Sequence, residues 1–313
     1  MGDVVVAEVV RSGFVESRHY GSIVALDPEG KVRWTRGDPE APVFARSCNK
    51  PIQATSMVRS GLPLRGRLLA LVSASHSGEP FQLDGVREIL AGAGLSESAL
   101  QTPADFPSET SVRDAYIAAG GVASPIAMNC SGKHAGMLAT CVANGWPTES
   151  YRDPGHPLQR RIADDFADAT GQAVTAVGVD GCGAPLFGTT LVGLARAFGR
   201  IQQSADGTPE RAVADAIGGF PEYVSGTDRD EAKLLRAYPT AVAKGGAEAC
   251  YAVGMPDGSA VALKIGDGGA RARPVVMAAV LRALGWDEPV LDEVGNVAVL
   301  GGGKPVGEVR AAF

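Results

Sequence analysis

The sequence has 313 residues, a formal net charge of −6, and a composition that is 45% hydrophobic and 20% charged. Basic residues form no runs, which argues against a nucleic-acid-binding protein, and no apolar stretch approaches the roughly 20 residues that cross a bilayer. The first residues, MGDVVVAEVV, lack the features of a secretory signal. The 5 cysteines are scattered, so we expect reduced thiols in a cytoplasmic protein.

The N-terminal part of the chain predicts strands followed by helices. No repeat or low-complexity linker divides the sequence, so residues 1–313 are predicted to form a single domain. The predicted strands are Val4–Val10, Gly21–Leu26 and Val32–Thr35. A helical pattern runs from Ser47 to about Ser60, and the short apolar run Leu69–Ser73 fits either a strand or a buried helix.

The middle of the chain is predicted to be mainly helical. Helical spacing occupies Phe81–Ala93, His134–Asn144, Leu158–Ala169, Leu186–Phe198, Pro209–Ile217 and Arg229–Tyr238. One interruption, Val174–Val179, reads as a buried strand.

The C-terminal part predicts two hairpins around a helix. The stretch CYAVGMPDGSAVALKI places two apolar runs about a PDG turn, a helix follows at Pro274–Leu284, and VAVLGGGKPVGEV forms the second hairpin. Strand pairs at both ends with helices between them favour an α+β fold in which helices cover a largely antiparallel sheet.

Ser47 and Lys50, in ARSCNKPIQ, are the first candidates for chemistry. On a helix, residues three apart share one face and can meet. A serine hydroxyl becomes a nucleophile when a neighbouring base takes its proton, and a buried lysine with a lowered pKa can be that base. The alternative is an ordinary helix cap beside a solvated lysine, because this spacing is common.

Two further motifs extend the pattern. SASHSGE holds Ser75 and Ser77, and ALKIGDGG holds Lys264 two residues before Gly266. The order S-x-x-K, S-x-S, K-x-G resembles the S-x-x-K, S-D-N, K-T-G order of the penicillin-recognising serine enzymes. The expectation is a second serine–lysine pair, with Ser75 or Ser77 beside Lys264.

The stretch MNCSGKHAGM groups Cys130, Lys133 and His134, and VDGCGAP holds Cys182. Two thiolates, a third ligand and water would suit tetrahedral zinc, with His134 a more ordinary third ligand than lysine. The alternative is that both cysteines are small buried hydrophobes, which we expect of Cys48, Cys141 and Cys250. Lys244, in AVAKGGAEAC, is interpreted as part of a substrate-facing loop or as a simple strand-to-turn passage.

Taken together, SCNKPIQ, SHSGE, MNCSGKHAGM, VDGCGAP, AKGGAE and KIGDGG resemble the class 3 L-asparaginases over nearly the whole chain. The resemblance implies a fold similar to that of serine β-lactamases and glutaminases, a homodimer, and L-asparagine as the small-molecule substrate. It also implies a zinc site in which lysine is a ligand. One departure is QTPADFPSE at residues 101–109, where the family tends to carry a histidine and a cysteine.

The resemblance further implies roles for single residues. Ser47 with Lys50 and Ser75 with Lys264 match the catalytic tandems, and Cys130, Lys133 and Cys182 match the zinc ligands. The residues predicted to line the substrate site are Ser77, Lys244, His134 and Asp180, of which Asp180 matches an acidic residue near the metal.

Three functions are consistent with these residues. The first is hydrolysis of L-asparagine by Ser47 through an acyl-enzyme, with Lys50 as the base. The second is a hydrolase in which zinc-bound water attacks, or another β-lactamase-like serine amidase or esterase. The third is a silent protein that binds a small amino acid, which the presence of both Ser47 and Lys50 disfavours.

Overall fold

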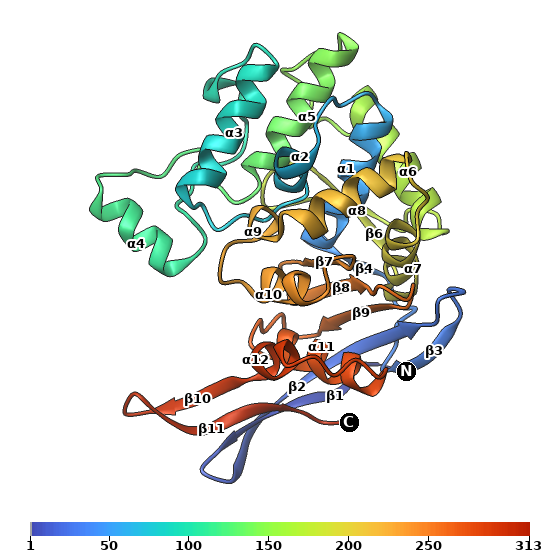
Figure 1. Cartoon of the computed structure of the whole chain (residues 1–313), viewed down its shortest axis with the longest axis vertical. Coiled ribbons are helices and arrows are strands. Elements are labelled where there is room, and N and C mark those ends of the chain that lie inside the picture. Colours follow the sequence, from blue (N-terminus) through green and yellow to red (C-terminus); the bar gives the residue numbers. More distant parts are fainter. Residues whose placement is uncertain (1) are drawn as a thin grey trace.

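An antiparallel sheet runs through the lower half of the molecule in the computed structural model, which describes residues 2–313 (Figure 1). Its strands follow the order β10-β11-β1-β2-β9-β8-β7, and β3 pairs with β2. These strands are β1 (Val4–Arg11), β2 (Phe14–Leu26), β3 (Val32–Arg36), β7 (Val242–Gly245), β8 (Cys250–Gly254), β9 (Ala260–Ile265), β10 (Val297–Gly301) and β11 (Lys304–Ala311). A smaller sheet orders β4 (Val43–Phe44), β6 (Pro185–Thr189) and β5 (Val177–Val179) as β4-β6-β5.

Helices cover both faces of the main sheet. Helix α11 (Ala272–Ala283) packs against β1, β9 and β11, whereas α7 (Leu191–Gln202) packs against β2, β8 and β9. Every residue of β8 is buried, as expected for a strand covered on both faces. The fold is therefore α+β with a largely antiparallel sheet, which confirms the predicted class.

Most of the remaining helices form a body on the α7 side of the sheet and along the sheet edge, whereas α12 (Val290–Gly295) lies beside α11 (Figure 1). The others are α1 (Lys50–Arg59), α2 (Gly66–Val72), α3 (Pro80–Gly92), α4 (Thr110–Ala118), α5 (Ser131–Asn144), α6 (Pro157–Thr170), α8 (Pro209–Gly219), α9 (Pro221–Val224) and α10 (Asp230–Ala237). Two short 3-10 helices, η1 (Arg46–Asn49) and η2 (Glu97–Ala99), complete the elements. Within residues 2–313, no helix combines the length and apolarity needed to span a membrane.

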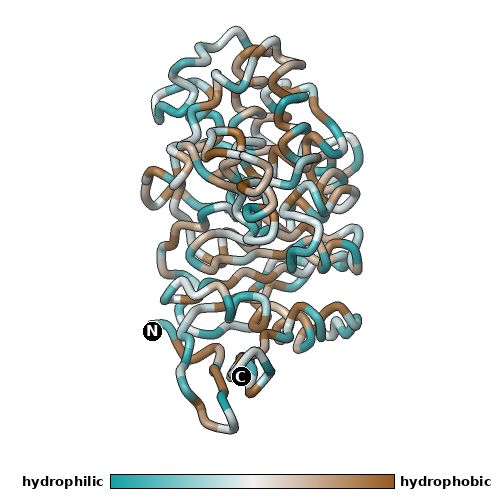
Figure 2. The backbone as a smooth tube through the Cα atoms, turned by 90° about the vertical axis from the view of Figure 1, so that its left-hand side faces the viewer, coloured by the Kyte–Doolittle hydropathy of each residue, from teal (hydrophilic) through white to brown (hydrophobic). Residues whose placement is uncertain are grey.

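Strand β2 changes character along its length. Its first half alternates between exposed and partly buried residues, whereas Gly21–Leu26 is buried throughout. The first half belongs to a hairpin with β1 that projects beyond the helices, and both termini lie at this end of the molecule (Figures 1 and 2). Only the second half of β2 is covered by helices, which explains why Gly21–Leu26 alone carried the pattern of a buried strand.

Two predicted elements were wrong. The run Leu186–Phe198, predicted as one helix, is strand β6 followed by helix α7, and Thr190 caps the helix by accepting a hydrogen bond from the Gly193 N–H at 3.1 Å. An apolar run of this kind has no periodicity that separates a buried strand from a buried helix. Strand β5 is shorter than the predicted buried strand Val174–Val179, and its Val179 is 78% exposed.

Other elements were predicted closely. The β8–β9 and β10–β11 hairpins are confirmed, and Leu69–Ser73 belongs mainly to helix α2. The predicted helix from Ser47 instead begins as η1 and continues as α1 from Lys50. Helices α4, α9, α12 and η2 and strands β4 and β7 were not predicted.

The glycines of MNCSGKHAGM bring α5 against α2. A Cβ atom on Gly132 would lie 2.5 Å from the Leu71 carbonyl oxygen, and one on Gly136 would lie 2.7 Å from the Val72 side chain. Residues with a side chain at these positions would push the helices apart. The close approach fixes Cys130 and Lys133, at the start of α5, next to the chain that leaves α2 toward Ser75.

Candidate active site

Ser47 lies in η1, half-buried, directly after a residue with unusual backbone geometry. Arg46 has φ of 50°, a left-handed value that costs a non-glycine residue about 1 kcal/mol or more. Within residues 2–313, the Ser47 hydroxyl makes no side-chain hydrogen bond and is therefore free to react. The strained turn and the unpaired hydroxyl are what an accessible nucleophile requires.

The Gly246 backbone packs directly against this turn. A Cβ atom on Gly246 would lie 2.8 Å from the Ala45 carbonyl oxygen and 3.2 Å from the Ser47 nitrogen. The AKGG segment at the end of β7 is therefore in contact with the residue predicted to be the nucleophile. Lys244, two residues earlier on β7, also contacts η1, because its carbonyl oxygen accepts from Cys48 Sγ at 3.0 Å.

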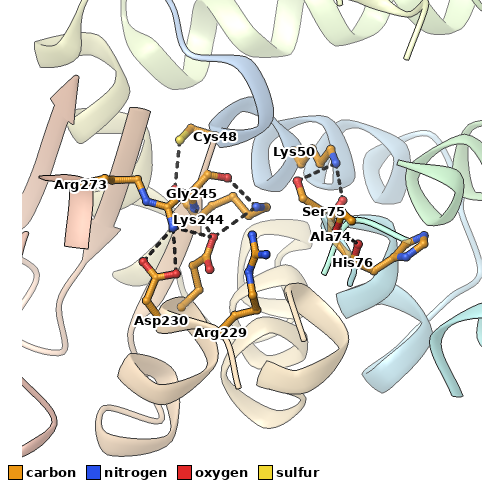
Figure 3. Close-up of polar contacts among 12 residues, drawn as sticks. Cys48, Lys50, Ala74, Ser75, His76, Arg229, Asp230, Lys244, Gly245 and Arg273 are labelled. Carbon is orange, nitrogen blue, oxygen red and sulfur yellow. Dashed lines mark hydrogen bonds and ion pairs between the residues drawn. The ribbon is translucent and has the colours of Figure 1, made fainter. Parts of the chain in front are cut away.

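Lys50, at the start of α1, is buried and pairs with Ser75. Its Nζ donates to Ser75 Oγ at 2.9 Å and to the Ala74 carbonyl oxygen (Figure 3). The same Nζ lies 3.2 Å from Cys130 Sγ. The structure thus brings together two residues assigned to different tandems. It also connects the serine–lysine pair to the cysteine cluster through one ammonium group.

Lys264 does not meet Ser75. It lies on β9, opposite Cys250, and its Nζ donates to the carbonyl oxygens of Glu248 at 2.8 Å and Ile265 at 3.2 Å. In residues 2–313, no hydrogen bond joins Lys264 to either Ser75 or Ser77. The arrangement therefore departs from the expected Ser75–Lys264 tandem, because the end of β7 rather than β9 packs against Ser47.

Lys244 is the buried lysine at that strand end. Its side chain has 0% exposure, and its Nζ donates to the Gly245 carbonyl oxygen at 2.6 Å and lies 3.9 Å from Glu231 Oε1. Burial, opposed by the charge of Glu231 and reinforced by that of nearby Lys50, lowers the pKa of Lys244 to about 8. A lysine that titrates near neutral pH can give and accept protons during a reaction.

Cys130, Lys133 and Cys182 converge in a buried cluster. Lys133 Nζ donates to Cys182 Sγ at 3.1 Å, whereas Cys130 Sγ donates to Asn129 Oδ1 at 3.2 Å. Interaction with Cys130 lowers the pKa of Cys182, while interaction with Cys182 and burial raise the pKa of Cys130. The sulfur that faces the lysine is thus the one whose charged form is favoured.

The Lys133 ammonium group is the positive charge that faces the Cys182 sulfur. Burial disfavours its ammonium form, but the sulfurs of Cys182 and Cys130, together with Asp180, raise the pKa of Lys133 above its ordinary value. Asp180 in turn accepts a hydrogen bond from Arg46 Nε at 2.8 Å. The cluster is thus connected to the residue that precedes Ser47.

The same donors fit a zinc ion. Two sulfurs and an amine leave one position open in a tetrahedral site. His134 Nε2 is buried and makes no hydrogen bond within residues 2–313, although the ring lies close enough to Cys182 for the sulfur to affect its pKa. No set of three His, Cys, Asp or Glu side chains suited to a metal occurs in residues 2–313, so a site here depends on Lys133, which has to lose its proton to bind.

His134 and Ser77 lie at the margins of these clusters. His134 Nδ1 shares a hydrogen bond of 2.6 Å with the Tyr151 hydroxyl, and burial lowers the pKa of His134 to about 4, so the ring is neutral. Ser77 is buried against Gly226, where a Cβ atom would lie 2.1 Å from Ser77 Oγ. Ser77 also borders a cavity of about 130 Å³ that Glu109 and Arg229 line.

The segment that departs from the family pattern packs beside His134. The Gln101 N–H donates to the Tyr151 hydroxyl at 3.2 Å, and Thr102 Oγ1 donates to the Pro125 carbonyl oxygen at 2.7 Å. Gln101 therefore holds the Tyr151 hydroxyl that bonds His134, and Thr102 anchors the same segment to the chain at Pro125. A larger cavity of about 430 Å³ lies elsewhere, along Ile52, Thr55 and Arg59, and contains none of the predicted site residues.

Sequence reasoning missed a group of charged residues around Lys244. These are Asp230 and Glu231 at the start of α10 and Arg273 on α11. Their letters, DE in a polar helix and R in RARPVV, are typical of solvated surfaces. Nothing local signals that Glu231 is buried and that Asp230 and Arg273 are largely covered, because only the packing of α10 and α11 on the sheet encloses them.

The motif resemblance is confirmed at the level of the family. Residues 7–311 match the model of the L-asparaginase II family, and the chain belongs to that family. It is accordingly a hydrolase that acts on amides. No curated protein matches the sequence.

Among solved structures, partial likenesses of fold occur at low sequence identity. A β-lactamase of Mycobacterium bovis is 15% identical with a TM-score of 0.47, covering 84% of this chain and 94% of that chain. A putative β-lactamase of Bacteroides dorei is 16% identical with a TM-score of 0.40, covering 84% and 93%. EstCE1, a hydrolase with promiscuous acyltransferase activity, is 12% identical with a TM-score of 0.43, covering 88% and 93%.

Proposed function

We propose that this protein is an L-asparagine amidohydrolase that releases L-aspartate and ammonia through a serine nucleophile, Ser47. Membership of the L-asparaginase II family supports the substrate class. The observation that carries the mechanism is the meeting of Ser75, Lys50 and Lys244 around η1, with Lys50 Nζ 2.9 Å from Ser75 Oγ and Gly246 against the Ser47 nitrogen.

The reaction begins as Lys50 accepts the proton of the Ser47 hydroxyl. The Ser47 oxygen then attacks the side-chain amide carbon, and the bond from that carbon to nitrogen breaks as Lys244 gives the leaving amine its proton. Lys244 takes the part that the sequence assigned to Lys264. Water next attacks the acyl carbon and gives a proton to Lys244, and Lys50 returns its proton to the Ser47 oxygen as the ester bond breaks, which releases aspartate and restores the serine and both lysines.

The negative oxygen of the intermediate needs hydrogen-bond donors. The backbone N–H of Ser47, beside Gly246, is the proposed donor. One such donor contributes about 3 kcal/mol to transition-state stabilisation in comparable sites. Because Gly246 has no side chain, a substrate carbonyl can approach this N–H.

Zinc is part of the proposal as a resident ion. Cys130, Lys133 and Cys182 would hold it, and it would supply positive charge for the α-carboxylate or α-amine of the substrate. Asp180 would orient the lysine or a water on the ion. The cytoplasmic location and the homodimer predicted from the sequence likewise remain proposals.

A second candidate function is a hydrolase in which zinc-bound water attacks the amide. The one observation that favours it is the cluster of Cys130, Lys133 and Cys182. The test is ammonia release from L-asparagine and L-glutamine by wild type, by Ser47→Ala and by chelated wild type. The serine mechanism predicts turnover that is lost in Ser47→Ala, by at least about 10³-fold, and weakened by chelation. Activity that survives in Ser47→Ala but disappears on chelation would favour zinc-bound water.

If zinc-loaded wild type releases ammonia from neither amide, the asparaginase assignment fails. Ester and β-lactam substrates then test the broader assignment as a serine amidase or esterase. Circular dichroism of Ser47→Ala provides the folding control, since the half-buried serine makes no recorded side-chain hydrogen bond.

A further inference from the structure

A buried ionic cluster lies behind Lys244, on the side away from Ser75 (Figure 3). Glu231, at the start of α10, is 2% exposed, and Lys244 is fully buried. Arg273 from α11 and Asp230 complete the cluster. The side chains of Asp230 and Arg273 are partly exposed, at 17% and 12%. Burying the charges of Glu231 and Lys244 is expensive unless they are paired, so the pairing within the cluster determines their cost.

The contacts divide the cluster into two parts. Arg273 Nη2 donates to both carboxylate oxygens of Asp230 at 2.8 Å and lies farther, 3.9 Å, from Glu231 Oε1. Glu231 Oε1 accepts the Gly245 N–H at 3.1 Å and lies 3.9 Å from Lys244 Nζ. Arg273 is therefore committed mainly to Asp230, and the Glu231 carboxylate faces the Lys244–Gly245 segment.

Glu231 has unused bonding capacity. Its second oxygen, Oε2, has no hydrogen-bond partner in the described part of the chain. A buried carboxylate with a free oxygen is normally costly, and its retention at this position indicates a role beyond packing. The oxygen that is used bonds the residue next to Lys244, which fixes the carboxylate beside the amine.

Four side chains from different elements act on the Lys244 charge. Lys50 of α1 and Arg273 of α11 oppose it, as does burial, whereas Glu231 of α10 and Cys48 of η1 favour it. Of these, Glu231 is the carboxylate, and its own pKa stays well below the usual range because the charges of Arg273 and Lys244 outweigh its burial. Glu231 is therefore ionised whenever Lys244 is available for reaction.

We propose that Glu231 is a positioning residue that keeps Lys244 protonated and holds the β7 end in place through the Gly245 N–H. The proposal rests on the proposed function insofar as it makes Lys244 the proton donor to the leaving amine. Without Glu231, burial and two neighbouring cations would leave Lys244 neutral and unable to give a proton. Glu231 itself does not touch the substrate.

The first test is the pH profile of kcat/KM for wild type and Glu231→Gln. The glutamine keeps an oxygen for the Gly245 N–H but removes the charge. We expect the alkaline limb, which reports loss of the Lys244 proton, to move to lower pH by about one unit or more, as opposite charges at such distances do. Glu231→Asp keeps the charge farther away, so its limb should fall between the two.

The matched control is Glu293→Gln, which breaks a surface pair at 2.7 Å between Glu293 of α12 and Lys233 of α10, the helix that carries Glu231. Its profile should be that of wild type. If Glu231→Gln does not fold, Glu231→Asp carries the test alone. A folded Glu231 variant with an unshifted alkaline limb would overturn the proposal.

The second test needs no activity. Lysine side chains labelled for NMR report the pKa of each amine, and the Lys244 signal is assigned by its absence in Lys244→Arg. We expect the Lys244 pKa to be lower in Glu231→Gln than in wild type. If wild type hydrolyses no amide but this shift occurs, the proposed function fails and the role of Glu231 stands; an unchanged Lys244 pKa refutes that role in either case.

Discussion

Lys133 and Lys244 occupy two buried clusters that both contact η1, the helix that carries Ser47. The two environments nevertheless shift the lysine pKa in opposite directions. Both side chains are almost fully buried, which by itself lowers the pKa of a lysine. The sulfurs of Cys182 and Cys130 reverse that effect at Lys133, whereas at Lys244 burial prevails over the carboxylate of Glu231. The identity and proximity of the anion, rather than burial, separate a held ammonium from a proton-exchanging amine.

The distances explain the contrast. Cys182 Sγ lies 3.1 Å from Lys133 Nζ, but Glu231 Oε1 lies 3.9 Å from Lys244 Nζ and is shared with Gly245 and Arg273. A closer and less divided anion stabilises the charge more. Proton transfer is therefore expected at Lys244, whereas Lys133 keeps its proton unless a metal ion replaces it.

The largest expected effect is on turnover. Replacing Lys50 or Lys244 with methionine removes an amine that exchanges protons in the reaction, so kcat/KM for L-asparagine should fall by about 10² to 10⁴-fold. Lys264→Met decides between the two strand ends: a fall there that exceeds the fall in Lys244→Met would return the role to Lys264. Lys233→Met, on the surface of α10, is the control.

The next effect concerns the acid pair of the Lys244 cluster. Burial, followed by the charge of Glu231, raises the pKa of Asp230 from 3.8 to about 6. The folded state then binds a proton that the unfolded state has lost, so wild type should lose stability as the pH rises from about 4 to 6. A shift of this size corresponds to about 3 kcal/mol.

Asp230→Asn removes that titration. The difference in unfolding free energy between Asp230→Asn and wild type should therefore move in favour of the variant between pH 4 and 7, whatever its absolute sign. Urea unfolding at several pH values measures it. Asp292→Asn, which alters an exposed pair with Arg282, should show no such trend, and a parallel pH dependence for Asp230→Asn would contradict the raised pKa.

The smallest expected effect concerns metal binding by the sulfur cluster. Asp180 raises the pKa of Lys133 and contacts Arg46, so Asp180→Asn removes a group that orients the proposed ligand. Zinc affinity should weaken by about tenfold, the low end for such supporting residues, as measured by competition with a chelator. Asp84→Asn, on the surface of α3, is the control, and wild type that binds no zinc would refute the site.

Local patterns predicted much of the fold and several of the residues that lie around Ser47. Hairpin turns such as PDG and the helical spacing of α3, α6 and α8 are encoded within short windows, and these elements were found where expected. Ser47, Lys50, Ser75 and the two cysteines followed from motifs that resemble one family. The convergence of Cys130, Lys133 and Cys182 depends on α5 and the VDGCGAP loop meeting, which the motifs implied only through that resemblance.

The choice between Lys244 and Lys264 could not be made from the sequence. Both lysines end an apolar strand and precede glycines, so K-x-G is satisfied twice. Strand order decides between them, because β7 lies at the sheet edge against η1 while β9 lies inside the sheet. Glu231 was missed for a related reason: an acid in a polar helix looks solvated until the tertiary structure covers it.

The contact of Gly132 with the Leu71 carbonyl oxygen makes α2 and α5 one mechanical unit. Helix α2 leads into Ser75, and α5 begins beside Cys130 and Lys133. A shift of α5 by a fraction of an ångström therefore has to move the Ser75 loop as well, since the glycine leaves no slack between the helices. A change at the sulfur cluster that moved α5 would therefore displace the serine side as well as alter the charge near it.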